Sequence, residues 1–131
     1  MPSIYTYQKK DKLKSRKQTQ YLFSKGQSIN QFPIKLIYTI EHHPEHSGLK
    51  AGVGAPTRTF RKAVLRNRVK RLLREGYRLE KPAFLSGIQL EGKVINLFFL
   101  YTDAVVLDQR LIQEKIKQLL IKLSEKINTS A

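Results

Sequence analysis

Residues 58–74 read Arg-Thr-Phe-Arg-Lys-Ala-Val-Leu-Arg-Asn-Arg-Val-Lys-Arg-Leu-Leu-Arg, and eight of these 17 residues are basic while none is acidic. The apolar residues between them recur at intervals of three and four: Leu65, Val69, Leu72 and Leu73. This spacing predicts a helix over about residues 61–78, with one side packed on a core. The opposite side then carries concentrated positive charge, for which a polyanion is the expected partner.

The composition favours a single basic domain. The chain has 131 residues, 40% of them hydrophobic, and a net charge of +15 from 25 basic and 10 acidic residues. We therefore expect one domain over residues 1–131, with a basic lead-in at 1–14 and a frayed tail at 128–131. Nucleic acid is the first partner class for such a charge, and an anionic membrane surface is the second.

Several classes of protein are disfavoured by what the sequence lacks. It has no cysteine, which removes disulfides, thiolate metal sites and cysteine nucleophiles. It has no apolar run long enough to span a membrane, and its first residues lack the apolar segment of a secretory signal. The simplest expectation is a cytoplasmic protein without a membrane partner.

The rest of the chain predicts a small sheet packed by helices. A helix is expected over residues 15–25, ending at Gly26. The alternating stretch 32–41 predicts a strand, and 49–55 a second strand antiparallel to it through the turn at 42–48. Residues 79–93 are interpreted as a loop, and 94–102, apolar on both faces, as a central strand.

The last expected helix begins after Asp108 and runs to about residue 127. The fold class is therefore an α+β, or α-β sandwich, with a small mixed sheet packed by helices. The expected order is α-β-β-(β)-α-β-α, in which the bracketed strand is optional.

The preference for arginine in residues 58–74 indicates which class of polyanion is the expected partner. Guanidinium groups bind phosphate through two parallel hydrogen bonds and also stack on bases, which ammonium groups do less well. The helix offers a broad cationic surface with no base-reading pattern. These features favour recognition of structured RNA by its shape and backbone over sequence-specific reading of DNA.

The stretch Lys62-Ala63-Val64-Leu65-Arg66-Asn67-Arg68-Val69-Lys70-Arg71-Leu72-Leu73-Arg74-Glu75 resembles the signature of the bacterial ribonuclease P protein subunit, whose hallmark is the Arg-Asn-Arg helix. A weaker resemblance covers most of the chain, including Leu22-Phe23 before Gly26 and the Ala51-Gly52-Val53-Gly54 stretch. The family fold has an unusual left-handed strand-helix-strand crossover, against the usual right-handed preference.

The resemblance implies a role in tRNA maturation. The chain would bind ribonuclease P RNA and precursor tRNA, with no protein partner implied, and assist endonucleolytic removal of the 5′ leader. The RNA, with its bound Mg²⁺, would carry out the chemistry, so the protein alone is expected to be inactive. No catalytic residue and no protein metal site are implied. The alternative is a ribosomal-type protein that binds structured RNA without catalytic association.

Two sets of site residues follow from the resemblance. The surface for the catalytic RNA comprises Arg58, Arg61, Lys62, Arg66, Asn67, Arg68, Lys70, Arg71 and Arg74. The cleft for the single-stranded leader comprises Thr19, Phe23, Lys35, Ile37 and Thr39. Thr19 and Ile37 stand near positions where the family often has aromatic residues, so this cleft is expected to use charge more and stacking less.

Two other motifs are weaker. His42, His43 and His46 with Glu45 have metal-ligand chemistry, but Pro44 prevents a helix that would align them, so exposed turn histidines are expected. The Gly52-Val53-Gly54 stretch lacks the third glycine of a dinucleotide-binding loop. Small residues packed beneath a helix explain that stretch better.

Overall fold

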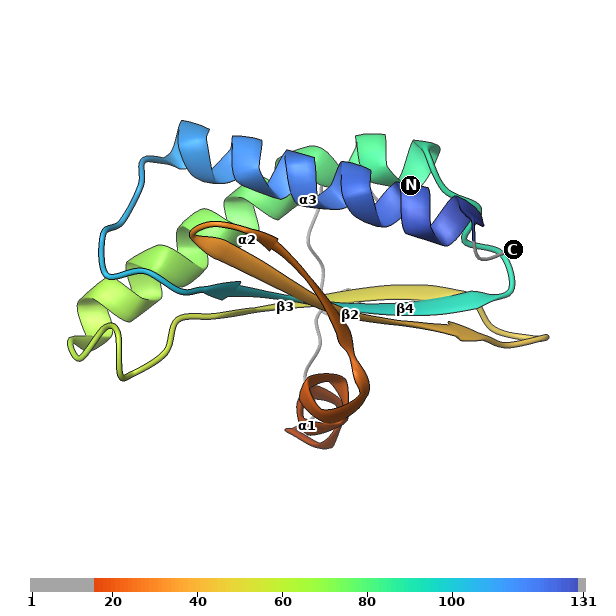
Figure 1. The fold of residues 1–131 in the computed structure, drawn as a ribbon, viewed down its shortest axis with the longest axis horizontal. Helices are drawn as coiled ribbons and strands as arrows, with labels where there is room; N and C mark the ends of the chain where they lie inside the picture. Colours follow the sequence, from red (N-terminus) through yellow and green to blue (C-terminus); the bar gives the residue numbers. More distant parts are fainter. Residues whose placement is uncertain (1–15, 130–131) are drawn as a thin grey trace, which may run out of the picture.

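The computed structural model describes residues 16–129, which form a four-stranded mixed sheet covered by two helices on one face and by one helix on the other (Figure 1). The elements are α1 (Arg16–Lys25), β1 (Gln27–Gln31), β2 (Ile34–His42), β3 (Gly48–Gly54), α2 (Ala63–Ser86), β4 (Lys93–Tyr101) and α3 (Gln109–Thr129). This arrangement confirms the expected fold class. The first residue of the helix expected over 15–25 and the basic lead-in lie outside the described residues.

The sheet order is β1-β2-β4-β3. Strand β2 runs antiparallel to both β1 and β4, and β3 runs parallel to β4. The prediction that residues 49–55 pair with the preceding strand is therefore wrong, because β4 lies between the two. The strand Gln27–Gln31 was missed, and it pairs with residues 34–38 of β2. Only Ile29 of β1 is buried, so its sequence carries little hydrophobic alternation.

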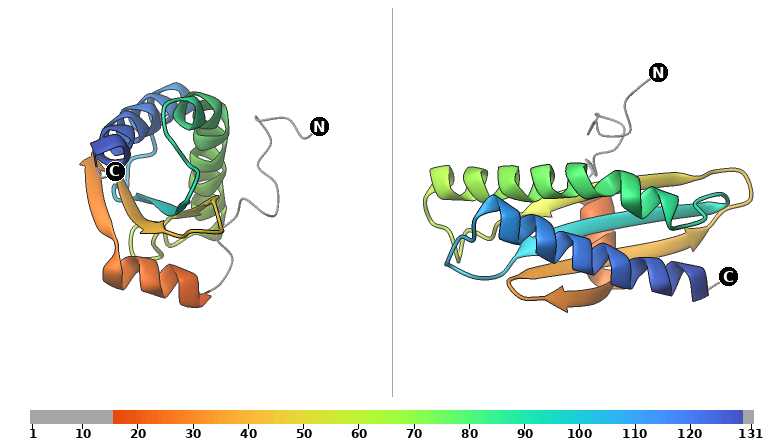
Figure 2. Two further views of the ribbon diagram at one scale, coloured as in Figure 1. Left: turned by 90° about the vertical axis from the view of Figure 1, so that its right-hand side faces the viewer. Right: turned by 90° about the horizontal axis from the view of Figure 1, so that it is seen from above.

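The connection from β3 through α2 to β4 is left-handed. Figure 2 (right) shows the sheet from the side that α2 and α3 cover. If this view is rotated until the parallel strands β3 and β4 point upward, β4 lies to the left of β3. Most strand-helix-strand units cross to the right. The structure thus has the crossover that the family resemblance implied.

Helix α2 is longer than the sequence predicted. It begins at Ala63 and continues through Pro82 to Ser86, so residues 79–86 are helical and the loop interpretation is wrong there. Tyr77 and Phe84 are both buried on the side that packs on α3. Burial of these rings outweighs the hydrogen bond that Pro82 cannot donate.

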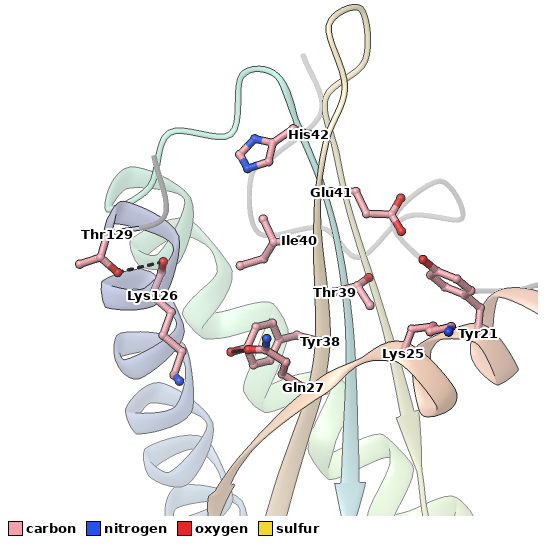
Figure 3. A pocket seen from close by; sticks show the side chains of 10 residues that line it. All are labelled: Tyr21, Lys25, Gln27, Tyr38, Thr39, Ile40, Glu41, His42, Lys126 and Thr129. Carbon is pink, nitrogen blue, oxygen red and sulfur yellow. Dashed lines mark hydrogen bonds between the residues drawn. The ribbon is translucent and has the colours of Figure 1, made fainter.

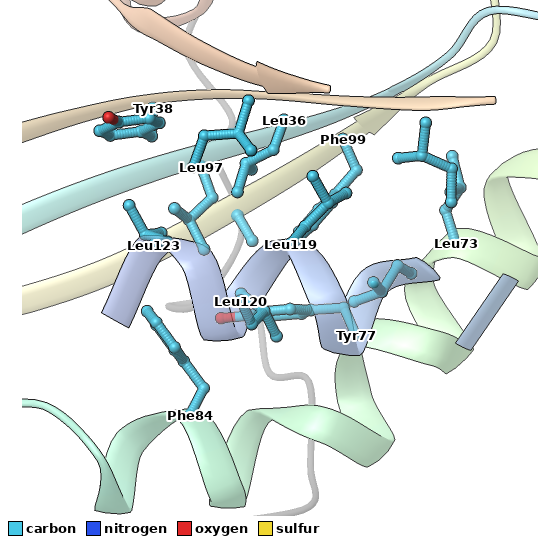
Figure 4. Close-up of a cluster of buried hydrophobic side chains, with 14 of the residues drawn as sticks. Leu36, Tyr38, Leu73, Tyr77, Phe84, Leu97, Phe99, Leu119, Leu120 and Leu123 are labelled. Carbon is cyan, nitrogen blue, oxygen red and sulfur yellow. The ribbon is translucent and has the colours of Figure 1, made fainter. Parts of the chain in front are cut away.

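The core lies between the sheet and the helix pair α2–α3. Figure 4 shows Leu36 and Phe99 from the sheet facing Leu119 and Leu123 of α3. The apolar stripe of α3 is buried in full: Ile112, Ile116, Leu119, Leu120, Leu123 and Ile127. Asp108 caps this helix, because its carboxylate accepts a hydrogen bond from the Leu111 N–H at 2.9 Å. Burial of this stripe fixes α3, and with it α2, on one face, which leaves α1 on the other.

Candidate nucleic-acid interface

The first half of α2 and the loop before it form a basic surface, which comprises Arg58, Arg61, Lys62, Arg66, Arg68, Lys70, Arg71 and Arg74 together with Asn67. All are exposed except Arg66 and Lys70, which are half-buried. No carboxylate of the described residues pairs with any of these cations. Their positive charge is therefore available to a ligand.

The start of α2 projects beyond the sheet (Figure 1). Leu65, expected on the core side, is 38% exposed, and Val64 is 79% exposed. Val69 and Leu73, one and two turns later, are completely buried. The first turn of the helix thus extends past the core, and its Val64 and Leu65 side chains are open to a large partner.

Arg66 differs from the other cations of the basic surface. Its Nη1 donates to the Phe60 carbonyl oxygen at 2.8 Å and to the Arg61 carbonyl oxygen at 2.9 Å. Helix α2 has no side-chain cap at Lys62, so Arg66 ties the preceding loop to the first turn. Phe60 anchors the same loop, because its buried ring packs on Tyr101 with 5.8 Å between centroids.

The acidic residue that follows the basic surface is already paired. Glu75 accepts hydrogen bonds from Arg78 at 2.5 Å and 3.1 Å. These bonds lower the pKa of Glu75 below its ordinary value. The nearest carboxylate on α2 is thus held by a residue one turn later and does not neutralise Arg71 or Arg74.

The other face of the sheet carries α1 and the predicted leader cleft. Phe23 on α1 is 47% exposed, and its ring packs edge-on against Phe98 of β4 with centroids 5.0 Å apart. Phe98 lies directly opposite Ile37 of β2 in the register of the sheet. Two aromatic rings and an aliphatic side chain therefore meet beneath α1, and Phe23 keeps nearly half of its surface open.

The remaining cleft candidates lie around this contact. Lys35 and Thr39 are half-buried and share the face of β2 with Ile37, which is itself only 7% exposed. Thr39 lies nearer to Tyr21 and Lys25, with which it lines a cavity at the edge of the sheet. Thr19, one turn before Phe23, is also half-buried.

Sequence reasoning missed three residues of this face: Phe98, Asn96 and Lys50. Asn96 lies between Thr39 and Lys50 in the sheet register, and its Nδ2 is 3.4 Å from the Thr39 Oγ1. The alternation of β4 does separate Asn96 and Phe98 from the buried Ile95, Leu97 and Phe99. Which neighbours they meet depended on a strand order that the sequence did not reveal.

The histidines and glycines of the two weaker motifs lie in strands β2 and β3 and in the turn between them. His42, His43 and His46 are exposed, and the His43 Nδ1 accepts the Glu45 N–H at 3.2 Å. Within residues 16–129, no three His, Asp or Glu side chains gather closely enough to hold a metal ion. In the same part of the chain, no helix has the length and hydropathy needed to cross a membrane.

Comparison with known proteins gives a consistent result. A sequence model of the family described as Ribonuclease P matches residues 7–124. The ribonuclease P protein component of Porphyromonas gingivalis is 28% identical over 132 residues, covering 99% of this chain and 95% of that protein. The corresponding protein of Geotalea uraniireducens is 36% identical over 81 residues, covering 62% of this chain and 68% of that protein.

Two solved structures share the fold. The RNase P protein of Staphylococcus aureus superposes with a TM-score of 0.64 at 22% identity, covering 86% of this chain and 94% of that one. The RNase P protein of Thermotoga maritima gives 0.65 at 20% identity, with 85% and 96% covered. With the family match over most of its length, the chain belongs to the ribonuclease P protein family, as a protein subunit that acts with ribonuclease P RNA on precursor tRNA in 5′-end maturation.

Proposed function

We propose that the basic surface of α2 binds ribonuclease P RNA, and that the face beneath α1 holds the single-stranded 5′ leader of precursor tRNA. The observation that carries the first assignment is the set of eight cations without a carboxylate partner in the described residues. Contacts of this kind neutralise phosphates and release counterions, so they favour a large structured RNA regardless of its sequence.

The leader assignment is supported by the Phe23–Phe98 pair. Single-stranded RNA binds where aromatic rings offer a stacking face and nearby cations contact the backbone. Phe23 has an open face, and Lys35 and Lys50 lie on the same face of the sheet. Phe98 supplies the aromatic ring that Ile37 lacks, so we propose more stacking here than β2 alone predicted.

We further propose that the RNA subunit carries out the hydrolysis and holds most of the Mg²⁺, while this chain positions the leader. The proposal is supported by the family membership and by the surplus of cations on the surface that would face the RNA. In a bacterium both RNAs are made in the cytoplasm, and we propose that compartment for this chain.

A reconstitution assay tests the function. The purified chain is mixed with a bacterial ribonuclease P RNA and a precursor tRNA at low Mg²⁺ concentration, and 5′-leader removal is followed with time. We expect the chain to increase the rate, and we expect no cleavage without the RNA subunit. Unchanged rates would contradict the subunit role, whereas cleavage by the chain alone would contradict the assignment of chemistry to RNA.

Replacement of Phe23 by alanine tests the leader cleft. Loss of one stacking ring should weaken binding of leader-bearing tRNA by about 1–3 kcal/mol, while mature tRNA binds as before. Phe32→Ala is the matched control, because Phe32 is 68% exposed at the β1–β2 turn, outside the leader cleft. Equal losses for both tRNAs would remove the leader assignment and leave the basic surface intact.

A further inference from the structure

A cavity of about 490 Å³ lies at the edge of β2, on the flank of α1 away from the Phe23–Phe98 contact. Leu22 of α1 is 1% exposed and faces the sheet, so Tyr21 and Phe23 project to opposite flanks of the helix. Figure 3 shows the cavity between α1 on one side of the β2 edge and the end of α3 on the other. Its volume falls in the range of small-ligand sites.

The floor of this cavity is a free strand edge. The His43 N–H donates to the Gly92 carbonyl oxygen on the β4 side at 2.9 Å, and the β2–β4 register is continuous. Because backbone groups alternate in direction along a strand, those of Ile40 and His42 point away from β4. Strand β1 ends opposite Tyr38, so within residues 16–129 no strand lies beside Ile40 and His42.

The walls combine an exposed aromatic ring with two ammonium groups that have no carboxylate partner among the described residues. Tyr21 is 49% exposed, and the Glu41 carboxylate beside its hydroxyl raises the pKa of Tyr21. Figure 3 shows these two side chains pointing toward each other from α1 and β2. Lys25 and Lys126 line the cavity from α1 and α3, and no carboxylate of the described residues pairs with either.

We propose that this cavity binds one nucleotide of a single-stranded RNA, with its base against the free edge of β2 and stacked on Tyr21, and with its phosphates near Lys25 and Lys126. The outward N–H and C=O groups of Ile40 and His42 present a donor and an acceptor in the plane of the sheet. A base has the same pair of groups along one edge, and its flat face fits an exposed tyrosine ring.

The geometry favours a nucleotide over an added peptide strand. A peptide strand would gain affinity from a row of main-chain hydrogen bonds. Here the edge offers only two outward-facing residues before β1 closes it opposite Tyr38. A single base needs no more than that. The site lies beside the leader cleft and shares Thr39 with it, but its lining residues do not include Phe23.

An amide NMR titration of the full chain tests the proposal, with 5′-AMP and a short single-stranded oligoribonucleotide as probes. We expect both to shift the amides of Ile40 and His42. Tyr21→Ala should weaken this binding about 5- to 150-fold, and Tyr21→Phe, which keeps the ring, should retain most of it. Lys126→Gln should reduce the salt dependence by about one phosphate contact, while Lys117→Gln, an exposed lysine of the same helix outside the cavity, should not.

Three results would overturn the assignment. One is RNA binding without a shift at either amide. The second is a Tyr21→Ala variant, with an unchanged wild-type spectrum elsewhere, that binds both probes as tightly as the parent chain. The third is a shift of the same amides by an acidic pentapeptide but by neither RNA probe, which would make the edge a peptide site. Phe23→Ala should leave the 5′-AMP result unchanged, so failure here is distinguishable from failure of the leader cleft.

Discussion

Arg66 and Arg68 stand two residues apart in the Arg-Asn-Arg motif, yet their environments differ. Arg66 donates two hydrogen bonds to the loop carbonyls of Phe60 and Arg61, whereas Arg68 is exposed and belongs only to the basic surface. A motif arginine therefore supports the helix start as well as the charge. The two roles can be separated by measuring stability and RNA binding on the same variants.

We expect Arg66→Ala to lower the free energy of unfolding by about 1–3 kcal/mol, because it removes two hydrogen bonds from a charged donor. Arg68→Ala should leave stability within about 0.5 kcal/mol of the parent, since it lies on the surface away from such bonds. Urea unfolding measures both changes, and filter binding to ribonuclease P RNA should show weaker binding for each. Equal unfolding curves for the two variants would contradict the structural role of Arg66.

Tyr101 is the corresponding structural residue at the end of β4. Its buried hydroxyl donates to the Val105 carbonyl oxygen at 2.6 Å and accepts the Leu107 N–H at 3.0 Å, which shapes the turn before α3. Tyr101→Phe should cost about 1–3 kcal/mol of stability at neutral pH, because both partners lose a hydrogen bond. Thermal unfolding of the two proteins measures this difference.

The pH dependence of that difference has a defined sign. Burial raises the pKa of Tyr101 above its ordinary value, so folding favours the neutral phenol. The contribution is complete below pH 10.0, the ordinary value, and is lost as pH rises through the higher folded-state pKa. The stability gap between the parent chain and Tyr101→Phe should therefore shrink above that pH. A gap that widens there would contradict this environment for Tyr101.

At the scale of elements, Gly26 lies between α1 and β1 and allows α1 to pack closely on the sheet. A Cβ at this position would collide with the Leu22 carbonyl oxygen and approach the Ile37 Cγ2 to 2.9 Å. Gly26→Ala should destabilise the fold by about 1–3 kcal/mol and shift α1 over the leader cleft. Gly48→Ala is the control, because a Cβ there meets no atom within 4 Å. Urea unfolding would contradict this account if the two variants lost equal stability.

The same scale shows what local sequence could predict. The prediction of α3 was correct because six apolar residues at helical spacing all reach one core, and Asp108 marks the start of the helix. The pairing of β3 was wrong because turn residues 42–48 favour a hairpin locally, while the position of β4 between the strands depends on contacts far apart in sequence. Phe98 was missed in the candidate site for that reason.

The whole molecule carries a net charge of +15, and its basic surface has no carboxylate partners in the described residues. Self-repulsion of this size weakens the compact state when salt is low, whereas the same charges hold phosphate when RNA is present. Salt should therefore act in opposite directions on stability and on RNA binding. The Debye length falls from about 30 Å at 0.01 M to about 3 Å at 1 M ionic strength. Repulsion between these cations is therefore weakly screened at the low end of this range and strongly screened at the high end.

We expect the urea midpoint of the free chain to rise as KCl increases over that range, because screening relieves the repulsion. Affinity for ribonuclease P RNA should fall over the same range, with a slope that reports the number of phosphates contacted. Replacing Arg68 and Arg71 together with alanine should reduce both slopes, since the same two exposed charges contribute to each. A flat or falling urea midpoint would show that the fold tolerates its charge without repulsion, and would confine the role of these cations to the bound RNA.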